Sequence, residues 1–232
     1  MKNKQSGFTL IEIAIVLVII GLLLGGVLKG QELINSAKVK NLATDFKNVP
    51  IYIYGYQDKY KALPGDDANA QLHLGTTAQQ AATVSGGQTV GNGIIEGSWK
   101  TTTNTDESYL FWQHVRLAGF GPGSTDTSVA GQSAYLHTNT LGGRLGVTNS
   151  LAANNPITLP TPLQGTYVVC SDNIPFKFAK QLDVSLDDGN TATGSVQVTA
   201  AGTASGGTAI PTSGASTPVT TDDTPVLVCM GY

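Results

Sequence analysis

The sequence predicts an α+β protein in which a long N-terminal α-helix packs on a small antiparallel β-sheet domain with long loops. Three observations predict it: an unbroken apolar segment near the N-terminus, an apolar stripe of helical period after it, and short β-type runs toward the C-terminus. Charged residues make up only 12% of the chain and glycine contributes 28 of its 232 residues, which favours a loop-rich domain over a cytosolic helical enzyme. We divide the chain into residues 1–7, 8–28, 29–62 and 63–232.

The N-terminal apolar segment begins after seven residues that include Lys2 and Lys4 and no acid. No side chain from Ile13 to Leu28 is polar, and the apolar segment as a whole is about long enough to cross a bilayer. The lysines place the N-terminus in the cytoplasm and the C-terminal domain outside. A secretory signal peptide and a plain membrane anchor both fit the apolar run. Neither explains Glu12, because an acid within a membrane segment is costly and marks a candidate functional residue.

The segment around Glu12 carries a specific motif, Gly7-Phe8-Thr9-Leu10-Ile11-Glu12. It resembles the prepilin signature of type IV pilins and type II secretion pseudopilins. The resemblance implies that residues 1–7 are a leader peptide, that prepilin peptidase cuts between Gly7 and Phe8, and that the new amine of Phe8 is methylated. It also implies a single-pass inner-membrane precursor with a periplasmic domain. An inner-membrane assembly platform then incorporates the subunit into a homo- or heteropolymeric filament, extracellular or periplasmic, in Gram-negative bacteria.

Glu12 has a physical role in such a filament. In a bundle of parallel helices, the amine of Phe8 in a neighbouring subunit would neutralise the Glu12 carboxylate, and the pair would set the axial register. The alternative is an acid that is merely tolerated.

The helix is expected to run from Phe8 to about Lys61. Seven apolar residues at spacings of three and four predict the face that docks on the domain: Val39, Leu42, Phe46, Val49, Ile53, Tyr56 and Tyr60. The other face, with Lys38, Lys40, Asp45, Lys47 and Lys59, is expected to be solvated. Gly21, Gly25, Gly26 and Gly30 either loosen the helix or allow close helix packing, and Pro50 should kink or split it.

The C-terminal domain starts at a turn, Leu63-Pro64-Gly65-Asp66. We expect a surface loop at 75–93, a helix from Asp106 or Glu107 to Leu117, strands within 166–170, 195–200 and 225–229, and a flexible or exposed segment at 199–221. The domain also resembles a group of prepilin-type proteins of Gram-negative bacteria in the order of its motifs, which continue with Gly91-Asn92-Gly93, the run Phe111–Gly119, Leu186-Asp187-Asp188-Gly189 and Thr193-Gly194-Ser195-Val196.

Two cysteines end similar β-type runs, Cys170 and Cys229. In an oxidising compartment they predict one structural disulfide, with two free thiols as the alternative. A loop of this length contributes roughly 4 kcal/mol in the chain-entropy model.

No catalytic motif is present, so we predict no enzyme, no cofactor and no required metal. His73, His114 and His137 are dispersed and lack metal-ligand spacing. Structural calcium is the alternative that the acids allow. Asp183, Asp187 and Asp188, followed by Gly189 and Asn190, supply candidate oxygens, as do Asp66 and Asp67, but neither set has EF-hand spacing and both also suit ordinary turns.

The function predicted is a structural filament subunit, a minor pilin or pilin-like protein. A type II secretion pseudopilin and a membrane-tethered or pilus-tip adhesin or binding module are the alternatives. The formal charge of −3 argues against nucleic-acid binding unless a local patch forms at Lys177 and Lys180.

Overall fold

The computed structural model describes residues 10–82, 90–151, 153–212 and 221–232. The chain divides into two units, Met1–Lys38 and Val39–Tyr232. Residues 39–62, the larger part of the segment 29–62 that the sequence assigns to the helical spine, therefore belong to the second unit. We describe each unit by itself.

Helix α1 extends over Leu10–Tyr60 and includes Pro50. Of the two outcomes predicted at Pro50, a kink or a split, the split does not occur. Proline removes one helical hydrogen bond, but Val49 and Ile53 on the two sides of it are fully buried, and their packing holds the helical backbone. The helix ends close to the predicted position, because Lys61 adopts a left-handed conformation with φ of 55°.

The predicted apolar stripe of α1 faces the domain core. Six of its seven residues are buried, from Val39 to Tyr56, and Tyr60 is half-buried. The opposite face departs from the prediction at Lys38 and Asp45, which are half-buried instead of solvated. Burial raises the pKa of the Asp45 carboxyl to about 6.

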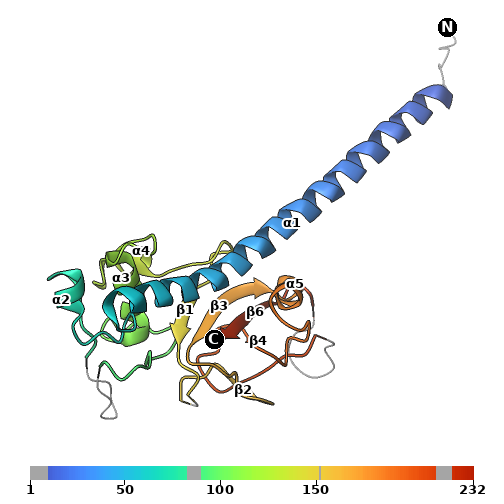
Figure 1. The fold of residues 1–232 in the computed structure, drawn as a ribbon. Helices are drawn as coiled ribbons and strands as arrows, with labels where there is room; N and C mark the ends of the chain where they lie inside the picture. The colour runs from blue at the N-terminus through green and yellow to red at the C-terminus, as the bar shows by residue number, and fades with distance from the viewer. Residues whose placement is uncertain (1–9, 83–89, 152, 213–220) are drawn as a thin grey trace, which may run out of the picture. The chain divides into compact units, whose positions relative to one another are not determined.

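The main sheet has four antiparallel strands in the order β1-β3-β6-β4 (Figure 1). The strands are β1 (Leu145–Thr148), β3 (Val168–Pro175), β4 (Val196–Ala200) and β6 (Pro225–Gly231). The three predicted runs correspond to β3, β4 and β6, while β1 was not predicted. Its Gly146 allows close packing, since a Cβ there would lie 2.0 Å from the Trp99 carbonyl oxygen.

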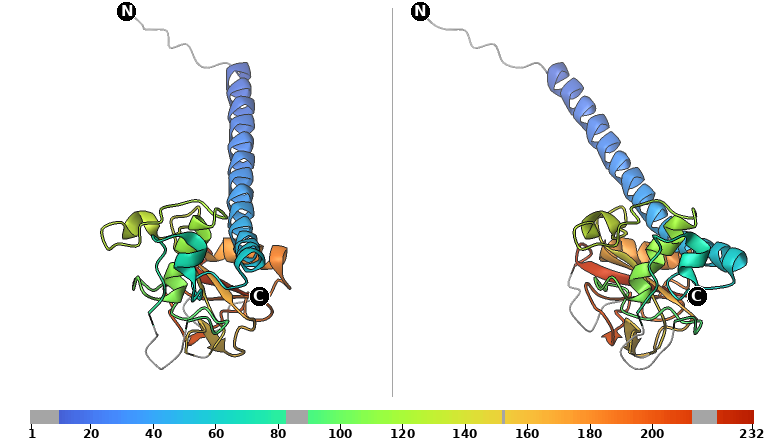
Figure 2. Two further views of the ribbon diagram at one scale, coloured as in Figure 1. Left: turned by 60° about the vertical axis from the view of Figure 1, so that its left-hand side comes forward. Right: turned by 90° about the vertical axis from the view of Figure 1, so that its left-hand side faces the viewer.

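Helices cover one face of this sheet. Helix α3 (Glu107–Leu117) begins and ends as predicted, and α5 (Phe176–Leu186) was not predicted. Side chains of α1, α3, α5 and the sheet form one core cluster, and both views of Figure 2 show α3 beside the C-terminal end of α1. A second, smaller cluster around Trp99 contains both cysteines.

The remaining elements are short: α2 (Ala70–Leu74), α4 (Gln132–Tyr135), and a parallel pair of β2 (Ile157–Leu159) with β5 (Gly207–Thr208). The segment 199–221, predicted to be flexible or exposed, contains β5 and buries Ala209 and Ile210, so the prediction is wrong at these two residues. The Ile210 amide donates to the Val198 carbonyl oxygen at 2.7 Å, and Ile210 is buried. Residues 213–220 lie outside the described residues.

The predicted surface loop at 75–93 is also only partly a surface loop. Ala78 and Ala81 are buried, and the Ala82 amide donates to the Thr105 carbonyl oxygen at 3.1 Å. Residues 83–89 lie outside the described residues.

Candidate functional site: the N-terminal apolar helix

The first part of α1 exposes its apolar side chains within its own chain. Exposure is 93% for Leu10 and 59% for Leu24, and most other large apolar side chains up to Ile34 are at least half exposed. Among the described residues, α1 is the one helix long and apolar enough to cross a membrane. An apolar surface of this size in a soluble monomer would be highly unfavourable, and it is compatible with a helix that enters a membrane.

Glu12 lies in the first turn of α1 and is exposed. An acid in this position is favoured by the positive end of the helix dipole. Gly7 and Phe8 lie outside the described residues, so the processing site and the pairing of Phe8 with Glu12 stay predictions.

Four glycines on this part of α1 have no packing role within the chain. A Cβ added at Gly21, Gly25, Gly26 or Gly30 would meet no atom within 4 Å. All four are helical, so no special backbone conformation requires glycine either. Within the described residues, no contact of α1 therefore explains these glycines.

The second part of α1 is fixed by a buried polar network. The Tyr56 hydroxyl donates to Asp67 Oδ2 at 2.6 Å, and His73 Nδ1 lies 2.7 Å from the same oxygen. Burial alone would raise the pKa of Asp67, but these hydrogen bonds hold it below its usual value. Asp67 is thus a structural acceptor that ties α1 to the domain.

His114 holds the turn after α1. Its Nδ1 accepts from the Gly65 amide at 2.9 Å, and its Nε2 lies 2.7 Å from the Gln79 carbonyl oxygen. Burial lowers the pKa of His114, so the ring is neutral, with one nitrogen accepting and the other donating. Gly65 itself is required by its φ of 92° and by close approach to Glu107, whose carbonyl oxygen would lie 2.3 Å from a Cβ.

The third histidine, His137, is half-buried and stacks on Trp112 with ring centroids 4.2 Å apart. Burial and the neighbouring Arg116 charge lower its pKa to about 4. The structure therefore uses all three histidines in packing contacts, and it does not bring them together.

Asp66 connects two of the motifs found in the sequence. Its carboxylate accepts hydrogen bonds from the backbone amides of Gly91, Asn92 and Gly93, so Asp66 of the first turn holds the distant Gly-Asn-Gly turn. Asp66 therefore serves as an acceptor for this turn, and it is not part of the acidic cluster formed by Asp183, Asp187 and Asp188.

Glu107 is a buried acid that the sequence did not reveal. Its Oε2 accepts from the Glu96 amide at 2.8 Å, and its other oxygen is buried without a hydrogen-bond partner. Burial raises the pKa of Glu107 to about 8, with contributions from the charges of Asp66 and Glu96. No sequence pattern marks it, because Glu107 reads as an ordinary helix-start acid.

The disulfide joins Cys170 and Cys229, as predicted. The two residues are direct partners in the register of β3 and β6. The bond thus fastens the last strand to the centre of the sheet.

Lys177 and Lys180 do not form an open basic patch. Lys177 Nζ lies 2.5 Å from Asp223 Oδ1, and Lys180 Nζ lies 2.6 Å from Asp222 Oδ1. Both charges are therefore compensated locally.

Among the candidate calcium ligands, the structure brings together only Asp183, Asp187 and Asp188.

These observations define a class of protein: an α+β domain that follows a membrane-compatible N-terminal helix. Residues 2–28 match the family model described as the prokaryotic N-terminal methylation motif. The chain therefore carries the prepilin-type cleavage and methylation segment that its N-terminus resembles, and the motif and helix fit a membrane-anchored precursor. No curated protein and no solved structure matches the chain.

Proposed function

We propose that this protein is a structural, non-enzymatic subunit of a type IV pilus-type filament, a minor pilin or pilin-like protein. The observation that carries the proposal is the combination of the matched motif at residues 2–28 with an apolar helix whose side chains are uncovered in the single chain. In the precursor, lipid covers this surface. In the filament, the same helices of neighbouring subunits cover it.

Cleavage of the leader creates the charged amine that sets how a subunit enters the filament. Prepilin peptidase would cut between Gly7 and Phe8 and leave a positive amine on Phe8. The Glu12 carboxylate of a neighbouring subunit would pair with that amine in a site with little water, where an ion pair is much stronger than at a wet surface. Because the pair forms only at one axial offset, it would select the register in which subunits enter.

The glycines of α1 support the same assembly. Gly21, Gly25, Gly26 and Gly30 have no intramolecular contact that a Cβ would disturb. Gly21 with Gly25, and Gly26 with Gly30, are each four residues apart, which places small residues where another helix can approach closely. When two helices approach closely, the apolar side chains of neighbouring subunits can pack against one another.

The test replaces Glu12 in the full chain, expressed in a bacterium with its own prepilin peptidase and assembly platform. Glu12→Leu should be cleaved and N-methylated like the natural chain, yet be lost from sheared filaments by at least about tenfold, because a buried amine is left unpaired. Mass spectrometry of the mature N-terminus measures processing, and the sheared and membrane fractions measure assembly.

Glu32→Gln is the matched control. Glu32 is also an exposed acid of α1, in contact with Lys29 at 2.6 Å, and its loss should leave incorporation unchanged. Normal incorporation of Glu12→Leu would contradict the register pair. An uncleaved chain found only in membranes would contradict the filament proposal and favour a tethered binding module. Filaments confined to the periplasm would favour a secretion pseudopilus over a surface pilus.

A further inference from the structure

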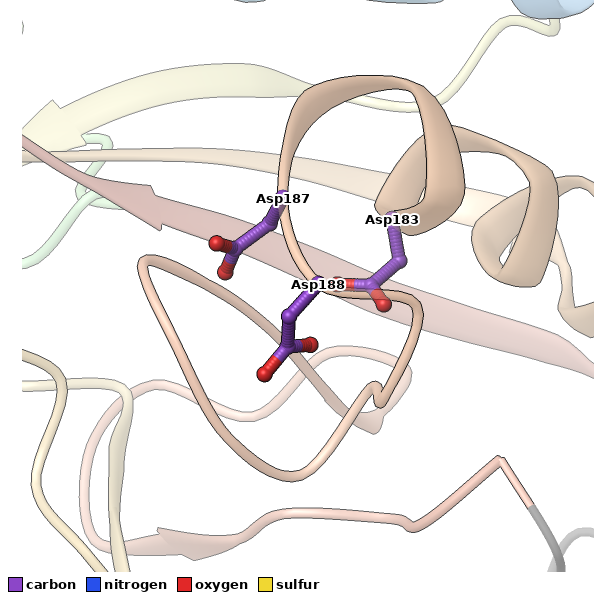
Figure 3. Close-up of side chains that lie close together, drawn as sticks. All are labelled: Asp183, Asp187 and Asp188. Atoms are coloured by element: carbon purple, nitrogen blue, oxygen red, sulfur yellow. The ribbon is translucent and has the colours of Figure 1, made fainter.

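Three aspartates gather where α5 ends. Asp183 is in the last turns of the helix, and Asp187 and Asp188 follow its final residue, Leu186. One carboxylate oxygen from each residue lies within 4.8 Å of the others. Figure 3 shows the three side chains around the turn, with the Asp183 carboxylate pointing toward the segment that carries Asp188.

Asp183 is the unusual member of the cluster. The residue has no exposed surface, and neither of its carboxylate oxygens has a hydrogen-bond partner within the described residues. The Gly189 amide favours its charged form weakly but does not reach hydrogen-bonding geometry. A buried carboxylate is normally paired with a charge, hydrogen-bonded, or bound to a metal, and Asp183 lacks the first two.

Within the part of the chain that the structure describes, no basic side chain compensates the cluster. The ion pairs among the described residues involve other acids, and none of them reaches Asp183, Asp187 or Asp188. Helix α5 has no basic residue in its last turn, although the C-terminal end of a helix carries partial negative charge. All local charges therefore attract a cation to the same place.

The other two aspartates are held in position and keep acceptor capacity. Asp187 Oδ2 accepts from the Val196 amide of β4 at 2.9 Å, and Asp188 accepts from the Asn190 amide at 2.8 Å and from Thr193 Oγ1 at 2.9 Å. A carboxylate has about four lone-pair positions, so each retains free ones. Asp187 comes so close to Gly194 that a Cβ there would lie 2.0 Å from Oδ2.

We propose that Asp183, Asp187 and Asp188 bind one calcium ion, which fastens the C-terminal end of α5 to the start of β4. The ligands are all hard oxygens, as calcium and magnesium prefer. Calcium accepts six to eight oxygens in irregular geometry, whereas magnesium requires a strict octahedron and usually few carboxylates. Asp188 is exposed, so water can complete the coordination. The site is separate from the N-terminal helix and concerns the domain alone.

The experiment uses the full chain in detergent micelles after treatment with EDTA. Titration with calcium chloride in a calorimeter should show one site, with a dissociation constant of roughly 10⁻⁴ to 10⁻³ M, as in extracellular calcium modules. At roughly 10 mM calcium, the Tm should rise by about 5 °C. Magnesium chloride at the same concentration should give less than half of that shift, and an equal shift would overturn the choice of calcium.

Two variants locate the site. Asp188→Asn changes an exposed side chain, so its Tm without calcium should match that of the natural chain, while its affinity for calcium falls about tenfold or more. Asp183→Asn should lose the calcium response and melt at or above the natural temperature in EDTA, because it removes a buried unpaired charge. Asp58→Asn, on an exposed acid of α1, is the control and should keep the full response.

The proposal fails if the natural chain shows no saturable heat with calcium, or if Asp188→Asn binds calcium like the natural chain. A variant at Asp183 that does not fold leaves the decision to Asp188→Asn, which tests the same site without changing a buried group.

Discussion

Leu24 and Leu42 lie on the same helix, yet 59% of Leu24 is exposed and none of Leu42 is. Around Leu42 the apolar residues repeat at helical spacing and face the domain core. Around Leu24 they surround the helix on every side, which is the pattern of a helix in lipid or in a bundle. The two parts of this one helix therefore have different surroundings, and only the second part is stabilised by packing on its own domain.

Substitution of the two leucines gives the largest contrast. Leu42→Ala should lower the free energy of unfolding of the domain by about 2 to 5 kcal/mol, because it removes buried apolar surface and leaves a cavity. Leu24→Ala should leave that free energy unchanged. Thermal or denaturant unfolding of the full chain in detergent micelles, followed by near-UV circular dichroism, measures both. A similar loss for the two variants would show that the parts are not energetically distinct.

The disulfide gives a second test of the difference between the two parts of the chain. Cys229→Ser should destabilise the domain by about 2 to 5 kcal/mol, while the N-terminal helix should still insert into the membrane. A reducing agent should reproduce the effect in the natural chain and have none in a Cys170→Ser/Cys229→Ser double variant. Equal melting of oxidised and reduced natural protein would contradict this prediction.

Glu107 predicts a pH dependence that belongs to the domain alone. Burial raises the pKa of its carboxyl from 4.5 to about 8, so between these values the folded protein holds a proton that the unfolded chain has released. Stability should therefore fall as the pH rises from about 4.5 to 8, by up to about 5 kcal/mol. Melting curves across this range test it.

Glu107→Gln is the control for that effect. Glutamine keeps an acceptor for the Glu96 amide and carries no charge, so the variant should lose most of the downward slope between pH 5 and 8. An unchanged slope would mean that another group titrates.

Glycine substitutions give the smallest effects, and the two parts of the chain should respond with opposite signs. Gly65→Ala should cost more than about 1 kcal/mol, because φ is 92° and the new Cβ meets the Glu107 carbonyl oxygen. Gly25→Ala meets no atom and should raise helix stability by up to ~1 kcal/mol. Circular dichroism of the natural chain and both variants tests the signs. If Gly25→Ala also reduces filament yield, the glycine serves contacts between subunits.

The sequence predicted α1, α3, three strands and the disulfide because each leaves a local signal: apolar periodicity, β-type runs or cysteine placement. It did not predict α5, whose preceding residue is Pro175 with no side-chain cap, so the usual start signal of a helix is absent. It did not predict β1 either, where Gly146 weakens the strand pattern.

The candidate site was predictable only in part. The prepilin motif is contiguous, so its residues could be read directly. Asp66 and Asp67 were recognised as acids with ligand capacity, but their partners lie up to 27 positions away. Only the fold shows that these acids hold turns and that Asp183 is left buried without a hydrogen bond.

The disulfide between β3 and β6 also determines how the domain responds to a pulling force. Strand β6 pairs with both β3 and β4, and Tyr232, just after β6, donates its hydroxyl hydrogen to the Phe46 carbonyl oxygen of α1 at 2.8 Å. Tension applied along α1 would pass through the buried stripe into the sheet, where strands must shear past each other to separate. Because Cys170 and Cys229 are covalently joined in opposed positions, β3 cannot slide along β6. Under a pulling force the domain should therefore yield first at the contacts of α1 and keep the centre of its sheet.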